Sequence, residues 1–264
     1  MTEERMAGPS LSPGDAMSEF EDIGGIVLDA VGTLIEASPS VAVAYAEAAR
    51  RQGVEVDPGL VRERFRQHFG ADEADELRGA LSTDEARERD RWRRLVGLVL
   101  PELPDPARGF DELWGHFARP DAWRCFDDVP AALDALERAG VAVRIGSNFD
   151  GRLRSVVAGL PALAGRSGGV VISSEVGVRK PHPGFYRAAV ASLGLPAGRV
   201  LFVGDDPGHD VEGPRRLGLR AALIDRDGRH SDTDAPRFDG LGRLVAAVLG
   251  VAPGPAGSPI EEGG

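Results

Sequence analysis

The chain has 264 residues, of which 42% are hydrophobic and 28% are charged, enough for one large domain or a core with a smaller module. The formal net charge of -11 argues against a nucleic-acid binder, because such proteins usually present a basic face, but it leaves room for a phosphorylated substrate held beside a cation. No apolar run is long enough to span a bilayer, no basic segment leads into an apolar one at the start, and Cys125 is the one cysteine, so we expect a cytoplasmic protein without membrane association.

In chain order, the segments 1–20 and 252–264 are rich in proline and glycine and are predicted to be disordered tails. A short apolar run, Ile26–Leu28, predicts the first strand. The next 85 or so residues predict helices without a strand between them, with Thr83 as an N-cap: Ser40–Arg51, Pro58–Phe69, Thr83–Leu100 and Ala107–Phe117. We therefore expect an all-helical cap domain at 38–123.

From Val129 onward, short apolar runs alternate with helical patterns that end in glycine. This alternation predicts an α/β class: a Rossmann-like parallel sheet core with helices on both faces, made of residues 21–37 and 124–251. A cap inserted after the first strand lies beside the crevice where such sheets bind ligands. The expected strands are Val141–Ile145, Val170–Ile172, Val200–Val203 and Ala221–Ile224, and the expected helices are Ala131–Ala139, Pro183–Leu193 and Val211–Leu217.

Four polar clusters follow strands or begin a helix and are expected at one edge of this sheet. They are Asp29 to Leu34, Gly146-Ser147-Asn148, Val178 to Pro183 around Lys180, and Gly204 to Asp210. Of the 31 basic residues, Lys180 alone is lysine. Taken singly, Asp29 could serve a turn, and Asp205, Asp206 and Asp210 could cap a helix. Brought together, these carboxylates would repel one another unless a cation such as Mg2+ joined them.

The segment Leu28-Asp29-Ala30-Val31-Gly32-Thr33-Leu34 resembles the first motif of the haloacid dehalogenase superfamily. Ser147 with Asn148, Lys180, and Gly204-Asp205-Asp206 with Asp210 are similar to its second, third and fourth motifs, and the likeness spans about residues 22–250. The resemblance implies that Asp29 and Lys180 are catalytic, with Asp29 as the nucleophile. It further implies phosphate binding by Ser147, Asn148, Gly32 and Thr33, and Mg2+ held by Asp29, the carbonyl of Val31, Asp205 and Asp206, with Asp210 supporting or completing that shell.

Val31 departs from the family pattern. In the family's phosphatases this position is a second aspartate that protonates the leaving group and later activates water, and losing such a group typically costs about 10²–10⁴-fold in rate. The acid could come from elsewhere, with Glu36 and His182 as candidates, or the substrate could have a good leaving group. A 2-haloacid dehalogenase needs no such acid but needs no Mg2+ either, and a phosphonatase would need a cap lysine that this chain lacks.

We expect a Mg2+-dependent phosphatase that acts on a small phosphorylated metabolite through an aspartyl-phosphate intermediate. The alternatives are a non-catalytic phospho-ligand-binding protein or a 2-haloacid dehalogenase; nothing in the sequence indicates an oligomeric state. Elsewhere we expect structural roles: Trp92, Trp114 and Trp123 in the cap core, Arg87–Arg94 on a solvated helix face, and His209 facing solvent.

Overall fold

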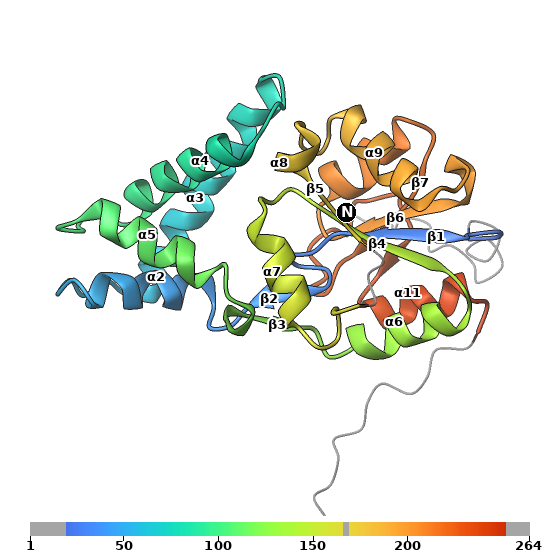
Figure 1. Cartoon of the computed structure of the whole chain (residues 1–264), viewed down its shortest axis with the longest axis horizontal. Coiled ribbons are helices and arrows are strands. Elements are labelled where there is room, and N and C mark those ends of the chain that lie inside the picture. Colours follow the sequence, from blue (N-terminus) through green and yellow to red (C-terminus); the bar gives the residue numbers. More distant parts are fainter. Residues whose placement is uncertain (1–19, 166–168, 252–264) are drawn as a thin grey trace, which may run out of the picture.

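The computed structural model describes residues 20–165 and 169–251, and it contains one parallel sheet with a helical domain beside it (Figure 1). Every pairing in the sheet is parallel, which confirms the predicted α/β class. The predicted tails lie outside the described residues except for Phe20, which is buried. The strands, in spatial order, are β5 (Val170–Ile172), β4 (Ala142–Ser147), β1 (Gly25–Leu28), β6 (Val200–Gly204), β7 (Arg220–Ile224) and β8 (Arg237–Phe238).

Helices cover both faces of this sheet because alternate residues of each strand point to opposite faces. In β1, Ile26 and Leu28 belong to one apolar cluster and Val27 to another. The first cluster includes residues of α6 (Val129–Arg138), α7 (Arg152–Gly159) and α11 (Leu241–Val248), and the second includes residues of α9 (Pro183–Leu193), which follows the short α8 (Ser173–Val176). Figure 1 shows α9 and the pair α6 and α11 on opposite sides of the sheet.

A helical segment does occupy part of the predicted range Val211–Leu217, but its start and its type differ from the prediction. The chain instead forms a wide, π-type helical turn, η3, over Pro207–Glu212, followed by a short α10 at Gly213–Arg215. The turn begins early because the side chain of Asp206 accepts a hydrogen bond from the backbone N–H of His209. Pro214 lies within α10 and has no backbone N–H, so one hydrogen bond of the helical ladder is missing where the π-type turn passes into α10.

The helical domain contains α2 (Val41–Arg50), α3 (Pro58–Arg78), α4 (Glu85–Val99) and α5 (Pro106–His116), which confirms the expected all-helical cap. These helices bury their own apolar core, separate from those of the sheet. Aspartates cap three of them: Asp57, Asp84 and Asp105 each accept a backbone N–H of the first turn. The expected N-cap Thr83 is therefore wrong by one residue, and its hydroxyl donates to Glu88 instead, at 2.6 Å.

A two-stranded ribbon that was not expected from the sequence connects the cap to the core. β2 (Ile35–Ala37) pairs antiparallel with β3 (Trp123–Cys125), which follows the single turn η1 at Pro120–Ala122. Strands this short carry too few residues to show an alternating pattern. The two strands of the ribbon lie at the two ends of the segment 38–123, which we propose as the limits of the cap.

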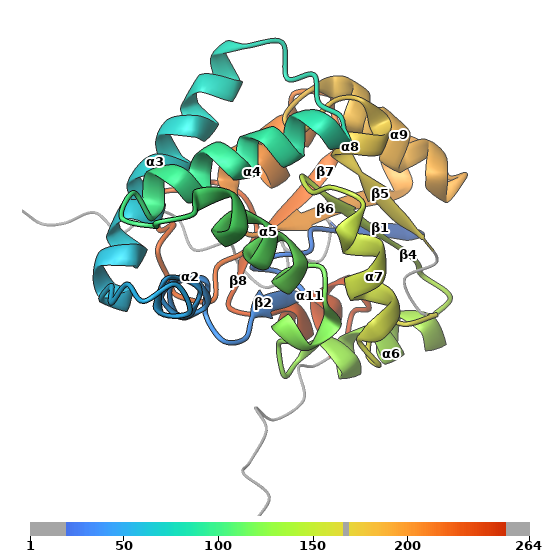
Figure 2. The same ribbon diagram turned by 60° about the vertical axis from the view of Figure 1, so that its left-hand side comes forward.

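The helix α3 continues to Arg78, well past the predicted end at Phe69. Gly70 and the acidic residues after it weaken the helical pattern, but side chains of this extension pair with arginines of α4 and of the core. Backbone groups also join cap and core, because Arg179 N–H donates to the carbonyl of Leu81 and Thr83 N–H donates to that of Gly177, both at 3.0 Å. Figure 2 shows α4 running up to α8 on this side of the molecule. Among the described residues, no helix is long and apolar enough to cross a membrane.

Candidate active site

The carboxyl ends of three adjacent strands and the inner face of the cap enclose a cavity of about 750 Å³. Asp29 follows β1, Ser147 ends β4 and Asp205 follows β6, so neighbouring parallel strands bring these side chains to one edge of the sheet. Lys180 reaches the same cavity from the loop before α9. The clusters predicted at the strand ends thus converge at one cavity.

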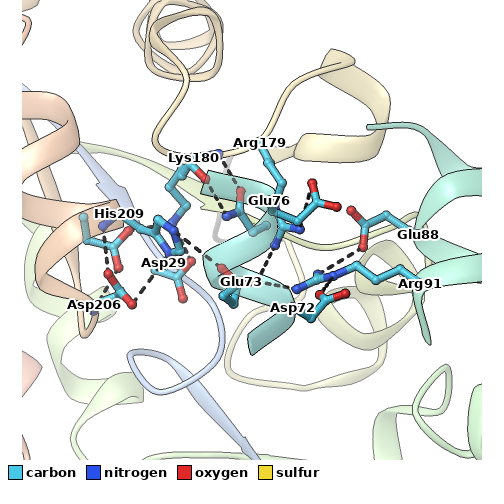
Figure 3. Close-up of polar contacts among 12 residues, drawn as sticks. Asp29, Asp72, Glu73, Glu76, Glu88, Arg91, Arg179, Lys180, Asp206 and His209 are labelled. Atoms are coloured by element: carbon cyan, nitrogen blue, oxygen red, sulfur yellow. Dashed lines mark hydrogen bonds and ion pairs between the residues drawn. The ribbon is translucent and has the colours of Figure 1, made fainter. Parts of the chain in front are cut away.

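Lys180 lies between two carboxylates. Its Nζ donates to Asp29 Oδ1 at 2.7 Å and to Asp210 Oδ1 at 2.6 Å, and the residue is 3% exposed. Burial alone would lower the pKa of this ammonium group, but the charges of Asp210 and Asp29 outweigh burial and raise the pKa above its usual value. Lys180 therefore stays charged beside the expected nucleophile (Figure 3).

Asn148 fixes the backbone of Lys180. Its side-chain Oδ1 accepts from Lys180 N–H at 2.7 Å and its Nδ2 donates to the Lys180 carbonyl at 3.0 Å. Ser147 lies beside Asp29 instead, and its hydroxyl acts to lower the pKa of that carboxyl group. Both residues line the cavity, as expected of phosphate-binding groups, but in this structure the Asn148 amide is used to place Lys180.

Asp29, Asp205 and Asp210 form a cluster in which one oxygen of each lies within 4.8 Å of the others. Burial raises the pKa of Asp29 to about 6, although Lys180 opposes this shift. Burial, together with the charges of Asp29 and Asp210, raises the pKa of Asp205 to about 7. Three buried or half-buried carboxylates and one lysine leave an excess of negative charge, and hard oxygen donors in such a group suit Mg2+.

Gly32 and Thr33 hold Asp205 in this cluster. Gly32 has a φ of +89°, and a Cβ added there would lie 2.3 Å from Asp205 Oδ2, so a larger residue would push the carboxylate away. The Thr33 hydroxyl, which is fully buried, donates to Asp205 Oδ1 at 3.2 Å. The sequence did not predict that these two residues position a carboxylate.

Two predicted site residues lie differently from the rest. Asp206 is outside the carboxylate cluster: its side chain is 52% exposed and accepts from His209 N–H at 2.8 Å, while Asp210 takes the place within the cluster. Val31 lines the cavity with 40% of its surface exposed, a large fraction for an apolar residue in a folded domain.

Glu36 and His182, the two candidates for the missing general acid, lie in different parts of the molecule. Glu36 lies on the β2–β3 ribbon, where it pairs with Arg124 across the strands, and it is not among the residues that line the cavity. His182 does line the cavity, but its Nδ1 caps α9 by accepting from Gly184 N–H at 3.0 Å.

The cap side of the cavity was largely missed from the sequence. Arg91 is buried among Asp72, Glu73 and Glu88, so the prediction of a solvated face is wrong for this arginine. Trp92 packs against the cap core, as expected, but also lines the cavity.

Glu73 connects the cap to two core residues (Figure 3). Its Oε1 accepts from Arg91 of the cap and, at 2.7 Å, from Arg179, which precedes Lys180. Its Oε2 lies 3.6 Å from His209 Nε2, and His209 Nδ1 lies 3.6 Å from Asp206 Oδ2. The expectation that His209 faces solvent is wrong, since its side chain is only 16% exposed between these carboxylates.

One signal in the sequence could have revealed this network. Asp72 and Glu73 precede Glu76 by four and three residues, so each lies on the same face of a continuous helix as Glu76. An acidic face on α3 requires basic partners, and Arg91 and Arg179 are the buried arginines that meet it.

A model of the haloacid dehalogenase-like hydrolases matches residues 23–218 of the chain. The chain is 32% identical over 230 residues to enolase-phosphatase E1 of Streptomyces avermitilis, with 80% of this chain and 89% of that protein covered. It is 28% identical over 220 residues to haloacid dehalogenase-like hydrolase domain-containing protein 3 of Danio rerio, again with 80% and 89% covered. Among solved structures it is similar to L-2-haloacid dehalogenase from Xanthobacter autotrophicus, with a TM-score of 0.66, 24% identity and 87% and 100% of the two chains covered; at that identity the likeness shows the fold alone.

Proposed function

The chain belongs to the haloacid dehalogenase-like hydrolase family, and on that premise we propose that it is a Mg2+-dependent phosphatase of a small phosphorylated metabolite. The observation that carries the proposal is the cluster of Asp29, Asp205 and Asp210 around Lys180. A carboxylate beside an ammonium group and further carboxylates suits nucleophilic attack on phosphorus near a cation. The likeness to an enolase-phosphatase supports the same reaction class.

In this proposal Asp29 attacks the phosphorus atom and forms an aspartyl phosphate, which water then hydrolyses. Lys180 attracts the phosphoryl oxygens and offsets the charge of Asp29. Ser147 and the backbone amide of Thr33 donate hydrogen bonds to those oxygens, and Asn148 keeps Lys180 in position. The backbone amide of Gly32 donates to the carbonyl of Ile35 at 2.9 Å, so Gly32 contributes by leaving room for Asp205.

Asp29, Asp205, Asp210 and the backbone carbonyl of Val31 are the groups that would hold Mg2+. When bound, the ion neutralises the charge that three carboxylates and a phosphate share. Asp206 supports the site indirectly, because it starts the helical turn that carries Asp210.

The same cluster argues against a 2-haloacid dehalogenase. Such an enzyme also binds an anionic substrate, but it needs no cation, so Asp205 and Asp210 would place uncompensated negative charge beside that substrate. A phosphatase gives these two carboxylates a purpose.

The test is hydrolysis of phosphate esters, acyl phosphates and 2-haloacids by the wild type and by Asp29→Asn, with Mg2+ or with a chelator. We expect phosphate release that requires both Mg2+ and Asp29. Halide release without Mg2+ would assign the chain to the dehalogenases. Phosphate binding without turnover of any substrate would make it a phospho-ligand-binding protein.

A further inference from the structure

The cavity has an apolar side next to Asp29. Val31, two residues after the nucleophile, exposes 40% of its surface there, and Phe69, Leu77, Leu81 and Trp92 of the cap line the same cavity. An apolar surface of this kind, close to a charged reaction centre, is suited to the part of a substrate that carries no charge.

Two aromatic rings form the firm part of this surface. The centroids of Phe69 and Trp92 are 6.1 Å apart with the rings inclined by 33°, and Phe65 packs behind both of them, stacked on Phe69 at 5.4 Å. The rings come from α3 and α4 and are held by the cap core. Aromatic faces of this kind favour contact with another flat ring.

The charged groups of the cap wall are already paired with one another. Arg91 contacts Asp72, Glu73 and Glu88, and Arg179 contacts Glu73 at 2.7 Å (Figure 3). Both arginines are almost completely buried. Arg91 belongs to the cap and Arg179 to the core, and burial keeps both guanidinium groups from a second anionic group on the substrate. Arg179 Nη1 has no hydrogen-bond partner and lies 3.9 Å from Glu76 Oε2.

The described residues of the cavity also hold no proton donor in the place of the family's second aspartate. That position is Val31, and Glu73 accepts two guanidinium hydrogen bonds. Of the two histidines on the wall, His182 caps α9 through Nδ1 alone, and His209 has a ring nitrogen 3.6 Å from each of Glu73 and Asp206.

From these contacts we propose that the substrate is an aryl phosphate, the phosphate ester of a phenol, with its ring between Val31 and the rings of Phe69 and Trp92. This inference rests on the proposed phosphatase function and names the substrate class for that site. An oxygen of Asp29 bonds to phosphorus while the bond from phosphorus to the phenolic oxygen breaks, and the electron pair leaves on that oxygen. A phenolate departs without a proton, so the reaction needs no acid at residue 31.

The second half of the reaction restores the enzyme. A water oxygen bonds to phosphorus, and the bond from phosphorus to the Asp29 oxygen breaks with its electron pair returning to the carboxylate. One proton of that water stays on the released phosphate and the other passes to solvent. Val31 cannot assist as a base, so we expect this step to be slow and the first turnover to release a burst of phenolate equal to the enzyme present.

The experiment compares four phosphates at saturating Mg2+: nitrophenyl phosphate, benzyl phosphate, acetyl phosphate and ethyl phosphate. The first two carry an aromatic ring, and the first and third have good leaving groups. The wild type should hydrolyse nitrophenyl phosphate and acetyl phosphate, which have good leaving groups, far faster than benzyl and ethyl phosphate. Val31→Asp should raise kcat/KM for those two slow substrates by about 10²–10⁴-fold and change the two fast ones little.

Ring recognition is tested with Trp92→Ala. This change should raise KM for the two aromatic substrates about tenfold and leave acetyl phosphate unaffected, while Trp92→Phe should retain most of the effect. Trp114→Ala is the matched control, because this cap tryptophan packs on Phe110 and does not line the cavity. Equal KM changes in Trp92→Ala and Trp114→Ala would reflect cap stability and overturn the ring contact.

Other outcomes overturn the inference in different ways. If the wild type hydrolyses benzyl and ethyl phosphate within tenfold of nitrophenyl phosphate, a proton donor is present, and loss of that activity in His209→Asn would identify it. If acetyl phosphate is preferred and Trp92→Ala has no effect, the aryl assignment is wrong while the phosphatase function stands. If no phosphate is turned over in an Asp29-dependent way, the proposed function itself fails.

Discussion

The cavity has a core wall that contains Asp29, Lys180, Asp205 and Asp210, and a cap wall that contains Glu73 and Arg91. Both walls contain charged side chains, but they balance charge differently. On the core wall, three carboxylates cluster together and two of them bind Lys180, and the pKa values of Asp29 and Asp205 are raised to about 6 and about 7. On the cap wall, Glu73 accepts hydrogen bonds from two arginines, and Arg91 forms ion pairs with three acidic side chains. Charge that is left unbalanced is available for a ligand, whereas charge paired within the protein is not.

The difference teaches which wall performs chemistry and which selects the substrate. Unbalanced carboxylates destabilise the metal-free protein and are stabilised by a bound cation, so changes there should alter activity and Mg2+ binding. Paired charges contribute to the packing of the cap on the core, so changes there should alter stability more than chemistry.

The largest expected effect is on the core wall. Lys180→Gln removes the ammonium group from between Asp29 and Asp210, and we expect kcat/KM to fall by about 10²–10³-fold at saturating Mg2+. Lys180→Arg should not restore activity, because a planar guanidinium cannot occupy the same point between two carboxylates. Activity within tenfold of the wild type would contradict the role of this residue.

The corresponding change on the cap wall is Glu73→Gln. It leaves Arg91 and Arg179 without their shared carboxylate, and we expect the free energy of unfolding to fall by about 3 kcal/mol in urea titrations. Asp75→Asn on the same helix is the control, because its pair with Arg78 is exposed and should be worth less than about 1 kcal/mol. An equal loss in both variants would mean that the bridge to the core adds nothing.

The contrast also predicts a pH dependence for the metal-free protein. The pKa values of Asp29 and Asp205 in the folded state, about 6 and about 7, lie above the ordinary value of 3.8, so between these limits the folded state binds more protons than the unfolded state. Stability should then fall as the pH rises from about 4 to about 7, by up to about 1.4 kcal/mol per pH unit for each proton released. Raising the pKa of Lys180 adds no slope in this range, because the group is charged in both states.

Thermal unfolding with a chelator, followed from low to neutral pH, checks this prediction. Mg2+ should restore stability mainly at the upper end of the range, and Asp205→Asn should flatten the slope. A stability that rises with pH in the chelated protein would contradict the raised pKa values.

The smallest expected effect concerns the hydroxyl that holds Asp205. Thr33→Val keeps the shape but removes the hydrogen bond to Asp205, and calorimetry should show Mg2+ binding weakened by about tenfold. The matched cap variant Thr83→Val loses a similar hydrogen bond, to Glu88, and should leave Mg2+ affinity unchanged. Equal loss in the two variants would place the effect in overall stability.

The sequence predicted the core wall well because backbone topology alone brings it together. Parallel strands end at the same edge of a sheet, so Asp29, Ser147 and Asp205 had to meet once their strands were found. Lys180 stood out because it is the chain's one lysine. Whether Asp206 or Asp210 joins the carboxylate cluster depends on the π-type turn at Pro207–Glu212, and no periodic pattern in the sequence predicts that turn.

The cap wall could not be predicted in the same way. Glu73 lies in the part of α3 beyond Gly70, whose helical state depends on partners distant in the sequence, at Arg91 and Arg179. A run such as Arg87–Arg94 has the same pattern whether its arginines are solvated or buried, and only the position of α3 decides that Arg91 is buried. The helical character of the cap followed from local patterns, whereas the identity of its inner face required the packing.

The most direct test of the account is the covalent intermediate on Asp29. The enzyme would be mixed with Mg2+ and nitrophenyl phosphate, quenched in acid within the burst, digested and examined by mass spectrometry. We expect one phosphoryl group on the peptide that contains Asp29, and none in Asp29→Asn. Turnover with a phosphoryl group on another residue, or with none trapped anywhere, would contradict it.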